Sequence, residues 1–82
     1  MMQRGRIRVR VQPGMFQSER SVSFQVGDQA YSLFVDQSDV QNDMLSVYVV
    51  EQKGDEAVID LPRETFTSGN RIRVPSSYLI GS

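Results

Sequence analysis

Arginine occupies every second position near both ends of this chain. The residues are Arg4, Arg6, Arg8, Arg10, Arg71 and Arg73, and the tetrapeptide Arg-Ile-Arg-Val occurs at both 6–9 and 71–74. Successive side chains of an extended strand point to opposite faces, so this spacing predicts an arginine face opposite an apolar face. A guanidinium group suits carboxylate and phosphate equally well. The chemistry that this pattern predicts is therefore the binding of anions.

Three interpretations of the arginine face are open. The arginines can pair within the sheet with Glu51, Glu56 or Asp60, contact an acidic protein surface, or neutralise the phosphates of a nucleic acid. If the first and last strands are neighbours, as in a closed barrel, their arginines form one stripe. Barrels that bind single strands usually interleave cations with stacking aromatic side chains, and no aromatic residue is expected in register here. Between the two kinds of partner, an acidic protein surface is therefore our prediction and nucleic acid the alternative.

Catalytic and metal chemistry have little support in this sequence. The chain has no histidine and no cysteine, which excludes a Ser-His-Asp arrangement, a thiolate metal site and a disulfide. The aspartates of 36–43 lack the ligand order of a calcium loop. The carboxylates of 51–60 surround a tight turn, where charges are typical of a strand edge. We expect a protein that is not an enzyme and has no cofactor and no metal site.

Turn signals divide the chain into short alternating segments. We expect strands at 5–12, 21–26, 31–35, 44–51, 56–61 and 71–74, with a hairpin over 20–36 and loops or short helical turns at 36–43 and 63–70. The strand at 44–51 is apolar on both faces, which predicts a central strand covered on both sides. With no helical period, this spacing predicts an all-β protein, a single small barrel or similar roll of about five to six short antiparallel strands.

The apolar sides of these segments predict the core. Its expected members are Phe24, Leu33, Leu45, Val47, Ile59 and Leu61. A chain of 82 residues supports one domain, which we assign to residues 1–82. The longest apolar run, Val47 to Val50, is too short for a membrane span. No signal peptide is expected, so we expect a soluble cytoplasmic protein.

The net charge of −1 conceals a strong asymmetry along the chain. Residues 1–20 carry a balance of +4, residues 21–70 a balance of −7, and the arginines at 71 and 73 add +2. Opposite charges on neighbouring strands stabilise a sheet and like charges oppose it. The terminal strands are therefore expected to lie together or against acidic strands.

The run Val74-Pro75-Ser76-Ser77-Tyr78-Leu79 resembles the end of a Src-homology-3 (SH3) domain, and Gly69 falls where that family often has a turn glycine. The resemblance implies an SH3-like fold in which Pro75 and Tyr78 line a groove for a polyproline-II peptide. The family's Ala-Leu-Tyr-Asp-Tyr-like segment and its groove tryptophan are missing. The other interpretation of Tyr78 is a final 3₁₀ turn that plugs the barrel end. The opening Gln3-Arg4-Gly5 is also similar to SH3-like accessory subunits of photosynthetic electron-transfer complexes.

These observations predict a non-catalytic protein-interaction module or small accessory subunit of a larger complex. Its contact surface is the arginine-rich strand face, with Met15 and Phe16 as exposed apolar anchors and with Pro75 and Tyr78 added by the resemblance. The alternative is a small nucleic-acid-binding β-barrel that uses the same arginines.

Overall fold

Strands make up most of this protein. The computed structural model describes residues 3–66 and 69–80. The strands are β1 (Gln3–Arg8), β2 (Arg10–Pro13), β3 (Glu19–Val26), β4 (Gln29–Asp36), β5 (Val40–Gln41), β6 (Met44–Lys53), β7 (Glu56–Asp60), β8 (Arg71–Pro75) and β9 (Leu79–Ile80). Two single-turn 3₁₀ helices, η1 (Gln37–Asp39) and η2 (Ser76–Tyr78), are the only helical elements among the described residues. The prediction of an all-β protein is confirmed.

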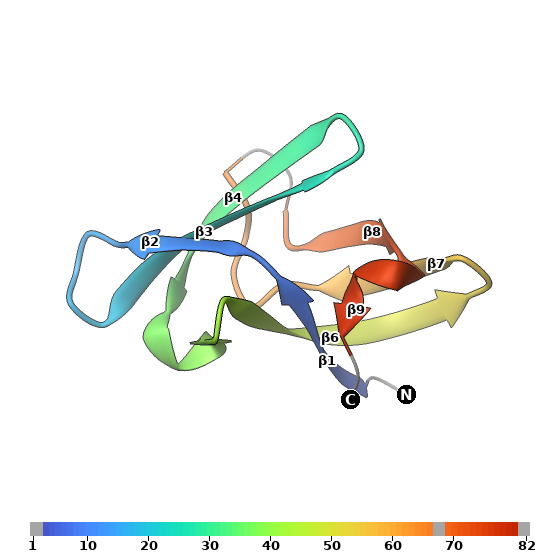
Figure 1. Cartoon of the computed structure of the whole chain (residues 1–82), viewed down its shortest axis with the longest axis horizontal. Helices are drawn as coiled ribbons and strands as arrows, with labels where there is room; N and C mark the ends of the chain where they lie inside the picture. The colour runs from blue at the N-terminus through green and yellow to red at the C-terminus, as the bar shows by residue number, and fades with distance from the viewer. Residues whose placement is uncertain (1–2, 67–68, 81–82) are drawn as a thin grey trace.

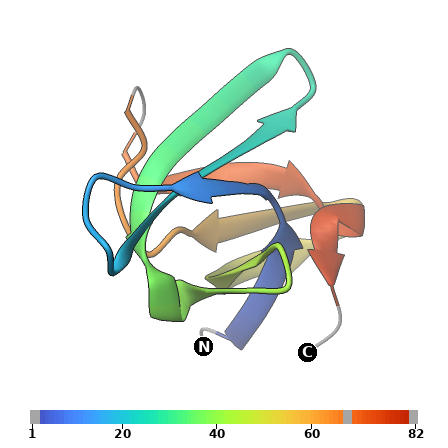
Figure 2. The same cartoon turned by 60° about the vertical axis from the view of Figure 1, so that its left-hand side comes forward.

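The strands form two antiparallel sheets (Figure 1). Sheet A has the order β8-β7-β6-β1-β9, with β5 beside β6, and sheet B has the order β2-β3-β4. Sheet A ends at β8 and β9, which do not pair with each other. Within the described ranges the strands therefore do not close into a continuous barrel. The β3–β4 hairpin projects beyond the rest of the molecule in both views (Figures 1 and 2).

The chain changes sheets at Val9. The predicted single strand at 5–12 is wrong, because β1 belongs to sheet A and β2 to sheet B. The Val9 N–H donates to the Asp43 carbonyl at 2.9 Å, outside both ladders. The Val9 side chain is nevertheless buried in the core, at 7% exposure. The crossing keeps the two-residue alternation intact, so the sequence pattern carries no sign of it.

Three tight turns use the left-handed backbone region. The β3–β4 and β6–β7 hairpins turn at Gly27 and Gly54, each with φ of 60°. The β5–β6 turn places Asn42 and Asp43 at φ of 54° and 61°, a pair of positive angles typical of a type I′ hairpin turn. Asparagine and aspartate tolerate this region better than most residues. The helical turn expected within 36–43 is η1, followed by the short strand β5.

The core lies between the two sheets and contains the residues that alternation predicts. Leu33, Leu45, Val47, Ile59 and Leu61 are all buried, whereas Phe24 is half-buried and packs against the core. The remaining buried apolar residues are Ile7, Val9, Val22, Val35, Val49, Ala57, Ile72 and Val74. Sheet A contributes most of them, all from one side.

The other side of sheet A is open. Strand β6 is central, as predicted, but it is not covered on both sides, because Tyr48 is 42% exposed. Met44 and Ser46 share the side of Tyr48 and are only half-buried. Outward-facing residues of β1, β6, β7 and β8 therefore form one accessible surface, which we call the outer face of sheet A.

Candidate functional site

The outer face of sheet A carries the arginines of β1 and β8. Residues directly opposite in an antiparallel pair point to the same side. The register Arg4↔Tyr48, Arg6↔Ser46 and Arg8↔Met44 therefore places the three β1 arginines beside the outward side chains of β6. These arginines are exposed, while Ile7 between them is fully buried. Arg71 and Arg73 lie on the same outer face, opposite Asp60 and Val58 of β7.

The six arginines do not form one stripe. Strands β6 and β7 separate β1 from β8, which places the two groups roughly 14 Å apart at three strand spacings. Arg10 lies in sheet B, opposite Ser23 of β3. The arginine-bearing strands β1 and β8 are not neighbours, because the chain returns to β1 through the two-residue strand β9. Strand β8 lies instead against β7, which carries Asp60, and this is the second of the two expected arrangements.

A row of four side chains crosses the outer face of sheet A. The register joins Arg71 to Asp60, Asp60 to Tyr48, and Tyr48 to Arg4. At one end, Arg71 donates from Nε and Nη2 to the two Asp60 carboxylate oxygens at 2.7 and 3.0 Å. This hydrogen bonding holds the pKa of Asp60 below its ordinary value and the pKa of Arg71 above it. One of the three predicted acidic partners is thus paired.

At the other end of the row, Arg4 covers Tyr48. The guanidinium carbon lies 5.6 Å from the ring centroid, within the range of a cation–π interaction. Arg4 Nη2 lies 3.5 Å from the Tyr48 hydroxyl oxygen, at the outer limit of a hydrogen bond. This contact raises the pKa of Arg4, and the charge of Asp39 adds a smaller contribution. An aromatic side chain therefore does lie in register with the arginines, contrary to the expectation from sequence.

Four of the six strand arginines make no side-chain hydrogen bond or ion pair with the residues that the structure describes. Within 3–66 and 69–80, no ion pair or hydrogen bond involves the side chains of Arg6, Arg8, Arg10 or Arg73. In the same ranges Glu51 and Glu56, the other acidic partners considered, make no ion pair. An ion pair within the sheet therefore accounts for the charge of Arg71 alone. The two arginines at the end of β1 point to solvent.

A hollow of about 410 Å³ opens where β1 passes into β2. Arg8 and Arg10 line it on either side of Val9, and Phe24 and Tyr78 contribute aromatic surface. The Tyr78 hydroxyl donates to the Gln25 carbonyl at 2.9 Å, and Phe24 stacks on Tyr31 with ring centroids 5.4 Å apart. Both aromatic rings are therefore held in place. We call this the β1–β2 hollow.

A second hollow adjoins the first. It measures about 370 Å³ and is lined by Arg8, Ser77, Tyr78 and Ile80. Arg8 and Tyr78 line both hollows, so apolar surface continues from Ile80 past Tyr78 to Phe24. Ile80 lies directly opposite Arg6 in the β1–β9 pair. The arginine row of β1 therefore runs beside these hollows.

The two residues that the SH3 resemblance places in one groove line different hollows. Tyr78 lines the β1–β2 hollow, whereas Pro75 lines a different one with Val26, Gly27 and Arg73. Pro75 precedes η2 and Tyr78 ends it, so the turn separates them. The 3₁₀ turn itself is present, and its tyrosine is half-buried against the core.

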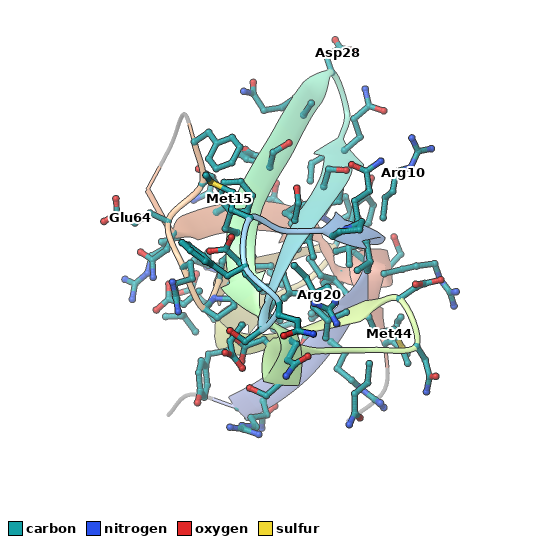
Figure 3. The ribbon with its side chains drawn as sticks, turned by 90° about the vertical axis from the view of Figure 1, so that its left-hand side faces the viewer. Arg10, Met15, Arg20, Asp28, Met44 and Glu64 are labelled. Carbon is teal, nitrogen blue, oxygen red and sulfur yellow. The ribbon has the colours of Figure 1, made fainter. Side chains whose placement is uncertain are left out.

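The proposed apolar anchors lie on another part of the surface. Met15 and Phe16 are 76% and 69% exposed in the loop between β2 and β3. They line a hollow with Arg20, whose guanidinium is bound to the carbonyls of Gln17 and Glu19. Figure 3 shows Met15 to the left of Arg10 in the view. Because β2 and β3 belong to sheet B, the loop between them does not extend the outer face of sheet A.

Sequence reasoning missed three residues of this region. Alternation places Tyr48 on the side of β6 opposite Leu45, but its register with Arg4 depends on a pairing between distant strands. Phe24 was assigned only to the core, and Ile80 was assigned no role. The signal available was apolar character alone, at Phe24 within the alternating segment 21–26 and at Ile80 next to Leu79. Apolar character does not distinguish a hollow from a core.

The described part of the chain contains no group of three or more acidic side chains that could hold a metal ion, and no helix there could span a lipid bilayer. No protein-family model, curated protein or solved structure matches the chain. The fold and the surface geometry are therefore the basis for any functional inference.

Proposed function

We propose that this protein is a non-catalytic binding module, or a small accessory subunit of a larger complex, that docks an acidic protein segment on β1. One observation carries the proposal. Arg6 and Arg8 are exposed at two-residue spacing on the outer face of sheet A and have no acidic partner within the described residues. Two like charges on one face repel each other unless an anion lies between or above them.

The spacing of these arginines matches that of an extended acidic segment. Alternate residues of a strand lie roughly 6.6–6.8 Å apart, so carboxylates at every second position of a partner segment meet one guanidinium each. Charge-assisted hydrogen bonds of this kind are roughly twice as strong as neutral ones. Strand β6 pairs with one edge of β1, and β9 pairs with the other at Arg6 and Ile7. The partner therefore lies across the face of β1 and does not add as a further strand.

The proposal includes an SH3-like arrangement of the strands. Its support is the 3₁₀ turn η2 between β8 and β9, together with the pairing of β9 with β1. In such an arrangement the end of the chain closes against its beginning, which places Tyr78 beside Arg8.

The test uses a synthetic peptide with four Asp-Ser repeats, acetylated and amidated at its ends. We expect Arg6→Gln together with Arg8→Gln to abolish binding in a fluorescence-anisotropy titration at low salt. The melting temperature should change little, because neither side chain bonds to another of the described residues. A matched control removes the same charge elsewhere with Arg63→Gln and Arg73→Gln. Equal binding by both double variants, or equal loss in both, would contradict docking on β1.

A second candidate is single-stranded nucleic acid, which one observation favours. Tyr48 is 42% exposed beside Arg4, and base stacking on an aromatic ring next to a cation is typical of single-strand binding. Titration with oligothymidylate distinguishes the two candidates. Binding that falls steeply with salt and is lost in Tyr48→Leu supports nucleic acid, whereas no binding at low salt excludes it.

A further inference from the structure

We infer that the β1–β2 hollow receives an aromatic side chain of the acidic segment, so that the segment is recognised by carboxylates followed by an aromatic anchor. This inference rests on the proposed function, because it assumes that the acidic segment lies along β1. The aromatic anchor fixes the register of the acidic segment on β1. The β1–β2 hollow is the part of this protein that selects the anchor.

Continuity of the surface is the first argument. A segment that pairs its carboxylates with Arg6 and Arg8 arrives at the end of β1, where Arg8 lines both hollows. Ile80 lies opposite Arg6, and Tyr78 follows beside Arg8. An extended chain on the arginines therefore reaches apolar surface within about one residue spacing of Arg8.

The composition of the hollow is the second argument. Its lining combines two arginines with the aromatic residues Phe24 and Tyr78 over buried Val9. Guanidinium groups stack on aromatic rings, and aromatic pairs attract each other beyond simple burial. No carboxylate lines the hollow, so its two cations are not neutralised from within. An aromatic side chain fills the apolar part of the hollow, and the acidic segment that carries it neutralises the two cations.

Rigidity is the third argument. The Tyr78 hydroxyl is held by the Gln25 carbonyl at 2.9 Å, and Phe24 stacks on Tyr31. A volume of about 410 Å³ lies at the lower end of the range of about 300–1,000 Å³ typical of ligand sites. Walls that are already ordered lose little freedom on binding, which favours one side chain of defined shape.

The test compares peptides that differ only in the anchor. One is the Asp-Ser repeat peptide described above, and two others carry an added phenylalanine at either end, because the direction of the segment is open. We expect one of the phenylalanine peptides to bind at least about tenfold more tightly than the repeat alone, since it buries a large apolar side chain. A two-dimensional NMR titration should shift the amides of Val9, Phe24 and Tyr78.

A filling variant tests the location. Ala30 lines the hollow from an exposed position on β4, so Ala30→Gln occupies the space without changing the charge. We expect this variant to lose the tenfold advantage and to bind the repeat peptide as before, while Ala30→Ser behaves like the parent.

Each outcome separates the two claims. Equal affinity for all three peptides overturns the aromatic anchor and leaves docking on β1 intact. An advantage that survives in Ala30→Gln, with shifts remote from the hollow, also overturns the anchor. Failure of every peptide to bind at low salt overturns the proposed function, and this inference with it.

Discussion

Shortening Leu45 to alanine should remove most of the stability of this protein. Leu45 is fully buried at the centre of sheet A, where it lies between Ile7 of β1 and Val40 of β5. Leucine-to-alanine changes in cores cost about 2–5 kcal/mol, and the cost rises with the cavity that remains. Three paired strands fix the backbone around Leu45 and prevent collapse, so we expect about 4 kcal/mol. A single core of this size yields only about 3–5 kcal/mol, which leaves a largely unfolded population.

Urea denaturation followed by circular dichroism measures this effect. Ile59→Val provides a milder change at another fully buried site. It should cost about 0.5–1.5 kcal/mol and lower the urea midpoint by roughly 0.5–1.5 M, given a slope of about 1 kcal/mol/M. Ser46→Ala, on the outward side of the Leu45 strand, is the control and should remain within about 0.5 kcal/mol of the parent. A Leu45→Ala protein with the parent's midpoint would show that the two sides of sheet A have been assigned backwards.

Three further changes test local features. A Cβ on Gly14 would lie 2.8 Å from the Glu19 backbone, whereas nothing lies within 4 Å of one on Gly69; thermal melts should show Gly14→Ala destabilised and Gly69→Ala near the parent. Asp43 has φ of 61°, so Asp43→Gly should raise stability by a few tenths to about 1 kcal/mol, and a lower melting temperature would contradict the turn assignment. Arg71 lowers the pKa of Asp60, so the stability from this pair should be complete above the ordinary aspartate pKa and decline as pH falls through the lowered value. Asp60→Asn should remove that part of an acid titration of stability, and an unchanged acid limb would count against the ion pair.

Much of the fold follows from two-residue alternation. Burial of one side of a strand requires this period, which is why the strands around Leu33, Leu45 and Ile59 were predicted with their inward residues. The hairpin over 20–36 and the tight turn within 51–60 were also predicted, and Gly27 and Gly54 supply the positive φ that these turns need. The short strands β5 and β9 were not predicted, because two residues carry no period.

The arrangement of the candidate site depends on pairings that alternation does not encode. The change of sheet at Val9 leaves the pattern of arginines unbroken, yet it places Arg10 on a different sheet from Arg8. The positions of Tyr48 beside Arg4 and of Ile80 beside Arg6 depend on the register between strands distant in the chain. By contrast, Arg71 and Asp60 lie on strands that follow each other, and their pairing was among the options considered.

The placement of β1 between β6 and β9 has a consequence for how the chain folds. The β3–β4 and β6–β7 hairpins close through short turns, but both partners of β1 come from much later in the sequence. Pairings between distant segments form slowly, because the entropic cost of closing a long loop comes before any stabilising contact. Strand β1 therefore keeps unpaired backbone edges while the hairpins are already complete. Like charges directly opposite each other disfavour pairing between two copies of such a strand, so we expect Arg4, Arg6 and Arg8 to oppose strand-to-strand association of two chains during this interval.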